Sequence, residues 1–238
     1  MKFLGFRRPD GKVGIRNHVL VLATVGCAAE AARQTADGIY GAVSFINQNG
    51  CGESSRNLRR TQDVLVGMAA NPNVYGVVAI GLGCEMNRMD GFIKELRART
   101  DKTIEGLLIQ EEGGTIQTVA KAKKIARRMV IEASMCRREE CDISELMLGI
   151  ECGGSDATSG LVSNPVMGII SDRIIAAGCQ LIVFTTGRGN AIGSAVAPVM
   201  KVTANGDTAR KLSDNIDLDM SAVLEEGVSL DAMADITM

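Results

Sequence analysis

The stretch HVLVLAT, His18–Thr24, decides the fold class, because it is a continuous apolar run of the length of one strand. Such runs are typical of parallel strands that are buried on both faces of a sheet. Further apolar runs alternate with segments of helical periodicity: we expect strands over 41–46, 75–82 and 103–109 and helices over 28–37, 57–70, 88–98 and 115–135. This alternation predicts an α/β protein with mostly parallel, doubly wound, Rossmann-like sheets.

Two features outside this core predict how the chain is divided. A Pro-Asp-Gly turn within Phe6–Asn17 indicates a hairpin-like arm ahead of the first strand. The polar stretch Arg137–Asp142 indicates a boundary, so we expect a first lobe of residues 1–140 with the arm and a second, shortened α/β lobe of residues 141–238. In the second lobe the expected elements are strands over 145–151, 179–184 and 199–204, a helix over 164–178 and a polar, acidic tail with weak helical signals. Asn164 and Pro165 would open that helix as N-cap and first-turn proline.

The helix over 115–135 is the longest one expected. Its apolar residues recur at steps of three and four, which predicts a face that packs on the core: Ile116, Val119, Ala122, Ala126, Met129, Val130 and Ala133. Lys121, Lys124 and Arg128 share the other face, which we interpret as a solvated helix surface.

The composition of the 238 residues excludes several classes of protein. A hydrophobic content of 46% indicates a folded globular chain, and a net charge of −2 argues against a nucleic-acid-binding surface. No apolar run approaches the roughly 20 residues of a membrane span, and the first six residues lack the apolar core of a signal peptide. We therefore expect a cytoplasmic protein that binds neither nucleic acid nor membrane. In that compartment the seven cysteines are expected to be thiols or metal ligands.

Three cysteines stand next to glycines at the ends of predicted strands: Cys51 in NGCGES, Cys84 in GLGCEMN and Cys152 in IECGGSD. Ligands of open α/β sheets bind at this carboxyl edge, so the three thiolates could converge there on a metal ion. Their long, unequal spacing fits an iron–sulfur cluster whose fourth iron is open to substrate. Spacing alone leaves open the alternative that they are unrelated small residues at turns. Cys27, which follows the first strand, is a spare ligand or a neighbour of the site.

Carboxylates and arginines close to these strand ends are the candidate catalytic and binding groups. Glu85, Glu151 and Asp156 each lie within a few residues of a cysteine and could serve as general base or metal ligand. Two arginines, Arg16 and Arg188, could grip a substrate carboxylate, and nearby polar side chains would add contacts: Asn17, Ser155 and Thr186. The loop that contains Arg188 lacks the lysine of a phosphate-binding P-loop. The single histidine, His18, excludes a histidine-rich zinc site.

Several motifs in the same order resemble the altronate dehydratase family, which includes galactarate dehydratase and, more distantly, sulfolactate sulfo-lyase. The resemblance covers Gly5 to about Ile216 and rests on GFRRPDGKVGIRNHVLVL, NGCGES, NPNVYGVVAIGLGCE, SELMLGIECGGSDATSGLVSNPVMGIISD and FTTGRGNAIGSAVAPVMKV. It implies an iron-dependent lyase that removes water from a sugar acid such as altronate and leaves a keto-deoxy acid. The metal would be an open 4Fe–4S cluster or a mononuclear Fe(II), with manganese as a further option.

The chain departs from the family pattern at three points. Asn47 stands where family members usually have a histidine, the small amino-terminal domain of fused members is absent, and a segment between about Gly178 and the TTGRG loop is missing. The absent domain suggests a separate small partner subunit, and we also expect an oligomeric assembly. Asn47 and the missing segment favour a second hypothesis, a catalytically silent relative that acts as a binding or assembly subunit. A third is a carbon–sulfur lyase of the sulfolactate type.

Overall fold

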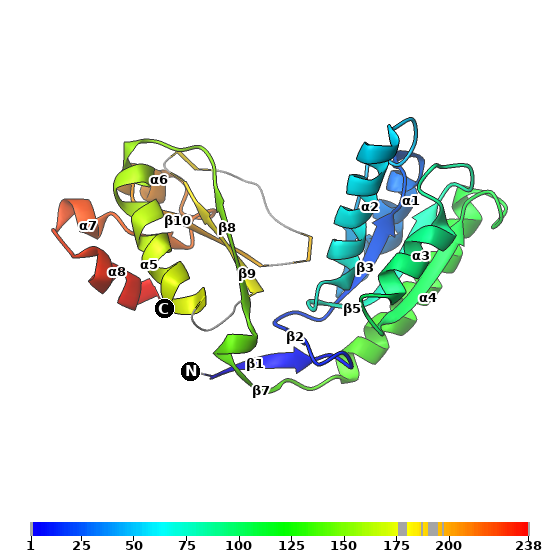
Figure 1. The fold of residues 1–238 in the computed structure, drawn as a ribbon, viewed down its shortest axis with the longest axis horizontal. Coiled ribbons are helices and arrows are strands. Elements are labelled where there is room, and N and C mark those ends of the chain that lie inside the picture. The colour runs from blue at the N-terminus through cyan, green and yellow to red at the C-terminus, as the bar shows by residue number, and fades with distance from the viewer. Residues whose placement is uncertain (1, 176–179, 187, 190–194, 197, 238) are drawn as a thin grey trace. The chain divides into compact units, whose positions relative to one another are not determined.

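The computed structural model describes residues 2–175, 180–186, 188–189, 195–196 and 198–237 (Figure 1). The chain forms two compact units. The first unit contains residues 4–140, and the second contains Cys141 onward together with Lys2 and Phe3. Each unit has its own four-stranded parallel sheet, so the expected α/β class of Rossmann-like parallel sheets is confirmed.

The sheet of the first unit has the strand order β4-β3-β5-β6. Its strands are β3 (His18–Ala23), β4 (Ala42–Phe45), β5 (Val74–Gly81) and β6 (Thr103–Leu108), and all three pairings are parallel. The two central strands, β3 and β5, carry the longest apolar runs, and residues 19–23 and 77–80 are fully buried. The continuous apolar runs therefore correspond to strands that are covered on both faces, as predicted.

Two pairs of helices cover this sheet. Helices α1 (Ala29–Ala36) and α4 (Thr115–Met135) pack together on one face, where they enclose a core with Val19, Val21 and the same-facing residues of β5. Helices α2 (Ser55–Ala70) and α3 (Met89–Arg97) pack together on the other strand residues. The chain therefore leaves the adjacent strands β3 and β5 toward opposite faces. The carboxyl ends of these strands form the switch point at which ligands of open α/β sheets bind.

The structure confirms most of the core-facing residues that the sequence predicted for α4. Ala122, Ala126 and Met129 are fully buried, and Val119 and Val130 pack against the same core. Ile116 was assigned to this face wrongly, since 83% of it is exposed. The buried series instead begins at Thr118, and Ile116 lies two residues away, about 200° around a helix of 3.6 residues per turn.

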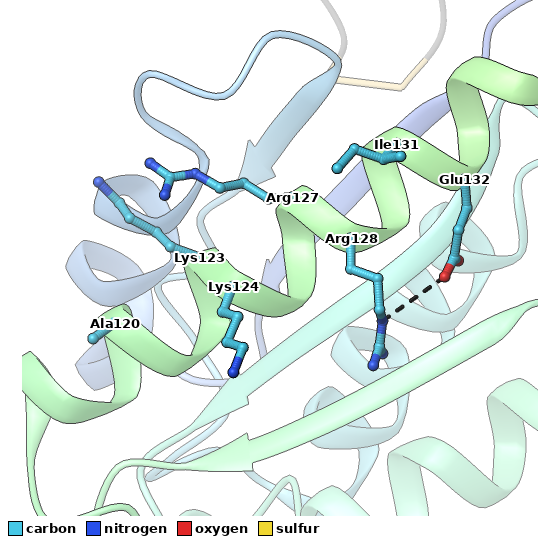
Figure 2. A pocket seen from close by; sticks show the side chains of 7 residues that line it. All are labelled: Ala120, Lys123, Lys124, Arg127, Arg128, Ile131 and Glu132. Atoms are coloured by element: carbon cyan, nitrogen blue, oxygen red, sulfur yellow. Dashed lines mark ion pairs between the residues drawn. The ribbon is translucent and has the colours of Figure 1, made fainter.

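The predicted basic face of α4 is exposed to solvent. Lys121 forms an ion pair with Glu112, and Arg128 forms one with Glu105. Figure 2 shows Arg128 close to Glu132, one turn further along the helix, where the ion-pair distance is 3.9 Å.

The second unit contains a sheet of order β11-β10-β9-β8. Its strands are β8 (Met147–Cys152), β9 (Gln180–Thr185), β10 (Val199–Thr203) and β11 (Leu218–Asp219), all paired in parallel. The helices are α5 (Asn164–Ile175), α6 (Gly206–Lys211), α7 (Ala222–Glu225) and α8 (Leu230–Thr237). The acidic tail is part of this fold, because Met220, Met233 and Ala234 are buried in its core. The predicted end of α5 at Gly178 and the strand position Cys179 lie outside the described residues.

Asn164 is not the N-cap of α5, as the sequence suggested. A π-helical turn, η3 (Ser159–Ser163), leads directly into α5, and the dihedral angles of Asn164 are helical, with φ −69° and ψ −44°. The side-chain oxygen of Asn164 instead accepts a hydrogen bond from the Thr185 hydroxyl at 2.8 Å, which connects the helix to β9. Asp156 takes the capping role, because its carboxylate accepts the backbone N–H groups of Thr158 and Ser159.

A small sheet of order β2-β1-β7 contains the predicted hairpin. Strands β1 (Lys2–Arg7) and β2 (Val13–Gly14) pair antiparallel, with Phe6 opposite Gly14. Strand β7 (Glu139–Asp142) lies in the polar stretch at which the sequence indicated a boundary, and the short helix η2 (Ile143–Glu145) follows directly after it. Within the described residues, no helix is long and apolar enough to span a membrane.

Candidate functional site

Three loops meet at the carboxyl edge of the first sheet, and we call them together the first loop cluster: residues 24–27, 47–51 and 83–87. The backbone oxygen of Thr24 accepts hydrogen bonds from the side-chain amides of Asn47 and Asn87, each at 3.1 Å. The backbone N–H of Asn87 donates to Gly50 at 3.1 Å, and the N–H of Gly26 donates to Asn49 at 3.0 Å. The three loops are therefore held to one another by direct hydrogen bonds across the switch point.

Glu85 is buried within this cluster, with an exposed fraction of 6%. One carboxylate oxygen accepts a hydrogen bond from the Thr24 hydroxyl at 3.2 Å, and the other accepts the backbone N–H of Gly83 at 2.6 Å. A Cβ atom at Gly81 would lie 2.2 Å from the Glu85 carboxylate, so a larger residue at the end of β5 would displace this carboxylate from its observed position. The predicted catalytic residue Glu85 thus lies at the switch point, with each carboxylate oxygen hydrogen bonded.

The first loop cluster also carries exposed cysteines. Cys51 and Cys84, two of the predicted metal ligands, are both exposed free thiols. Cys27, in the short helix η1 (Gly26–Ala28), is a third exposed thiol on the neighbouring loop, next to the Gly26 contact described above. In the described part of the chain, no three His, Cys, Asp or Glu side chains lie close enough together to hold one metal ion.

A cavity of about 300 Å³ opens beside this cluster, between the loop after β5, the start of α3 and β6. Its charged lining residues are Glu85, Arg88, Asp90, Glu111 and Glu112. Arg88 was missed in the sequence, although it follows Cys84 by four residues and immediately precedes α3. It is the arginine of this lining and is exposed to solvent.

The second unit has its own loop cluster at the carboxyl edge of its sheet, and we call residues 153–156, 186, 188–189 and Asn205 the second loop cluster. The Arg188 N–H donates to the Gly154 oxygen at 2.8 Å, and the Gly189 N–H donates to the Thr186 hydroxyl at 2.9 Å. Gly154 has φ +62°, and a Cβ atom there would lie 3.1 Å from the Gly189 oxygen. These contacts bring together four of the predicted site residues: Ser155, Asp156, Thr186 and Arg188.

Asp156 supplies the carboxylate of the second loop cluster. One oxygen accepts the Thr158 hydroxyl at 2.7 Å, and the other accepts the Asn205 amide at 3.0 Å. The Thr158 hydroxyl, followed by the Asn205 amide, lowers the pKa of Asp156 below its ordinary value. Asp156 is therefore ionised at neutral pH and is a weak base.

The remaining predicted residues lie in different places. Cys152 and Glu151 are the last two residues of β8, directly before the second loop cluster. Arg16 and Asn17 precede β3 and so lie at the amino end of the first sheet, away from the first loop cluster. The Asn17 side-chain oxygen accepts a hydrogen bond from the Arg8 guanidinium at 2.6 Å, and the Asn17 side-chain amide donates one to the Ala133 oxygen at 2.7 Å. These contacts indicate a structural role for Asn17.

Comparison with known proteins identifies relatives along both units. The family model described as D-galactarate dehydratase/altronate hydrolase, second domain, matches residues 5–134. The model described as D-galactarate/altronate dehydratase, C-terminal, matches in two segments, residues 143–177 and 173–238.

Similar proteins include the (2R)-sulfolactate sulfo-lyase subunit beta of Chromohalobacter salexigens, which is 40% identical over 182 residues, 76% of this chain and 45% of the relative. The altronate dehydratase of Escherichia coli is 33% identical over 184 residues, 73% of this chain and 36% of the relative. That of Bacillus subtilis is 33% identical over 189 residues, 74% of this chain and 37% of the relative. The chain spans less than half the length of these relatives. It belongs to the D-galactarate dehydratase/altronate hydrolase family.

Proposed function

We propose that this chain is a hydro-lyase that removes water from a sugar acid of the hexonate type. The observation that carries the proposal is the family match over both units, residues 5–134 and 143–238. The positions of the predicted site residues support it, because most of them lie in two loop clusters at the carboxyl edges of the two sheets. This edge is where open α/β sheets bind small molecules.

The reaction removes a proton from the carbon next to the substrate carboxylate, and the neighbouring carbon loses its hydroxyl group as water. The resulting enol rearranges to a keto-deoxy acid. Arg188 and Ser155, both exposed in the second loop cluster, would bind the substrate carboxylate. Because hydrogen bonds stabilise the ionised form of Asp156, we assign it to holding this loop rather than to taking the proton. Glu85 and Glu151 are the proposed bases.

Iron is the proposed cofactor, and Cys51, Cys84 and Cys152 are its proposed ligands. Two of these three cysteines fit the chemistry of such a cofactor. Cys51 and Cys84 are exposed thiols on adjoining loops, and thiolates are the ligands of iron–sulfur clusters. When bound, the metal would supply a Lewis acid for the substrate carboxylate or the leaving hydroxyl.

A second candidate is a carbon–sulfur lyase that acts on sulfolactate. It is favoured by the higher identity to the sulfolactate sulfo-lyase subunit, 40% against 33% for the altronate dehydratases. Because that relative is named as a subunit, we further propose that this chain works with a separate small subunit.

The test is an anaerobic purification with iron and acid-labile sulfide quantified, followed by turnover of altronate, galactarate and sulfolactate. A keto-deoxy acid from a hexonate would support the hydro-lyase, and sulfite from sulfolactate would support the second candidate. Cys84→Ser should abolish iron binding, and Cys136→Ser, at the half-buried end of α4, should retain it. Absence of both iron and turnover after reconstitution would leave a binding or assembly subunit as the better account.

A further inference from the structure

The cavity beside Glu85 is lined in part by charged side chains that remain free for a ligand. Within the described residues, the side chains of Arg88, Asp90 and Glu111 form neither an ion pair nor a hydrogen bond. All three residues are exposed to solvent. Two carboxylates and one guanidinium in this cavity of about 300 Å³ are therefore available to a small molecule.

Apolar groups form another part of the cavity wall. Met89, Ile93 and Leu108 line the cavity, and Met89 is only 7% exposed. A Cβ atom at Gly106, on β6, would lie 2.8 Å from the Ile93 side chain and 3.1 Å from the sulfur of Met89. A side chain at position 106 would therefore push these two groups out of the wall that they form. The cavity thus has an apolar surface whose shape depends on a glycine.

This combination of groups suits a chain of carbons that each carry a hydroxyl group. A hydroxyl group both donates and accepts hydrogen bonds, so carboxylates accept from it and a guanidinium donates to it. The C–H groups of such a chain pack against apolar side chains such as Met89 and Ile93. A metal ion is a poorer occupant. In the part of the chain that the structure describes, no three possible ligand side chains lie close enough together to hold one.

The cavity is also negatively charged. Its described lining has four carboxylates and one guanidinium, and the carboxylates are those of Glu85, Asp90, Glu111 and Glu112. An acid group of a ligand would meet these carboxylates, and contacts between like charges weaken binding. A neutral, hydroxyl-bearing group meets no such repulsion. The cavity therefore distinguishes ligands by charge as well as by hydrogen bonding.

We propose that this cavity binds the neutral, hydroxyl-bearing end of the sugar acid, and that Asp90 and Glu111 select against substrates that carry a second acid group. The inference rests on the proposed function, in which Glu85, on the wall of the same cavity, is a proposed base. A hexonate has a single carboxylate, at its reacting end. Galactarate carries a carboxylate at both ends, and sulfolactate carries a sulfonate on a shorter chain. The carboxylates of the cavity therefore favour a hexonate over both.

The first test compares kcat/KM for altronate with kcat/KM for galactarate. The double variant Asp90→Asn, Glu111→Gln keeps the shapes of both side chains but removes two charges, so the preference for altronate should fall about tenfold. Glu111→Arg should lower it further, because a guanidinium would attract the second carboxylate. The matched control Glu95→Gln, Asp101→Asn removes two exposed carboxylates of the same unit outside the cavity and should leave the preference unchanged.

Three kinetic results would overturn the proposal. One is a preference for altronate that is equal in the double variant and the unaltered chain. The others are a preference of the unaltered chain for galactarate and turnover of sulfolactate alone.

The second test measures binding without turnover, by NMR of the chain labelled at its methionine methyl groups. Altritol, the neutral hexitol in which a hydroxymethyl group replaces the carboxylate of altronate, should shift the signal of Met89. It should leave the signal of Met135, which is 74% exposed at the end of α4, unchanged. Met89→Leu and Met135→Leu assign the two signals, and Glu111→Arg should reduce the shift.

The two tests separate this inference from the proposed function. If no sugar acid is turned over but altritol shifts the Met89 signal, the proposed reaction fails and the assignment of the cavity to a polyhydroxyl chain stands. If altritol leaves the Met89 signal unchanged, the assignment of the cavity is overturned, whichever substrate the chain turns over.

Discussion

At the scale of single residues, Lys102 is a buried cation with an altered titration. Its ammonium group donates to the Ala70 oxygen at 2.9 Å and to the Asn71 oxygen, at the end of α2. Burial, with a smaller effect of the Arg8 guanidinium, lowers the pKa of Lys102 from 10.5 to about 7. Between these values the unfolded chain binds one proton more than the folded chain. The free energy of unfolding should therefore rise with pH from about pH 7 upward, by about 1 kcal/mol per pH unit.

Urea titrations between neutral and mildly alkaline pH would measure this slope. Lys102→Met keeps the length of the side chain but has no titrating group, so its free energy of unfolding should rise less steeply than that of the unaltered chain. Equal slopes for the two proteins would refute the altered titration of Lys102.

A substitution of Arg188, also at the scale of single residues, would test how the proposed substrate is bound. If its guanidinium holds the substrate carboxylate by two parallel hydrogen bonds, Arg188→Lys keeps the charge but loses that geometry. We expect KM to rise about tenfold. Arg210→Lys is the control, because Arg210 pairs with Asp207 on the surface of the same unit. Steady-state kinetics that show no change for Arg188→Lys would remove it from the site.

At the scale of elements, α4 offers a direct comparison between its two faces. Met129 is fully buried and Met135 is 74% exposed on the same helix. Met129→Ala should lower the free energy of unfolding by about 2–5 kcal/mol, because it removes buried apolar atoms and leaves a cavity. Met135→Ala should change it by less than about 0.5 kcal/mol. Chemical denaturation would measure both, and similar losses would contradict the assigned orientation of α4.

The positions of strands were predictable from the sequence where one local signal determined them. The hydrogen bonds between loops were not predictable. The strands of the first sheet follow from uninterrupted apolar runs, and their predicted ends differ from the observed ends by about one residue. The bonds from Asn47 and Asn87 to Thr24 join residues 23 and 63 positions apart and have no periodic pattern. The cap of the α5 region was misread for a related reason. Asn164 and Pro165 are a correct local signal, but Asp156 and the turn η3 had already started the helix.

At the scale of the whole molecule, the two units have separate cores. The cluster that contains Met129 shares no residue with the cluster that contains Met220. We expect calorimetry to resolve two unfolding transitions. Met129→Ala should lower one of them and Met220→Ala the other, each by on the order of 10 °C. A single transition that both variants shift equally would mean that the units unfold together.

The positions of the candidate site residues within the two units were predictable in part. The three cysteines were expected at strand ends: Cys152 is the last residue of β8, Cys84 lies in the loop after β5, and Cys51 lies further along the loop after β4. Arg88 and the role of the acidic tail in the second core were not foreseen. Both depend on which loops and helices a sheet brings together, and single segments do not reveal that.

The continuity of the first unit has a consequence for synthesis on the ribosome. Residues 4–140 are contiguous, so every strand and helix of the first sheet has emerged before the last strand of the second sheet is translated. Domains of growing chains generally fold as units, amino-terminal first. The second unit needs Met220 and Met233 for its core, so it can complete its packing only when nearly the whole sequence has left the exit tunnel. In the interval, a folded first unit would carry an unfinished parallel sheet, and unpaired strand edges of this kind are prone to aggregate.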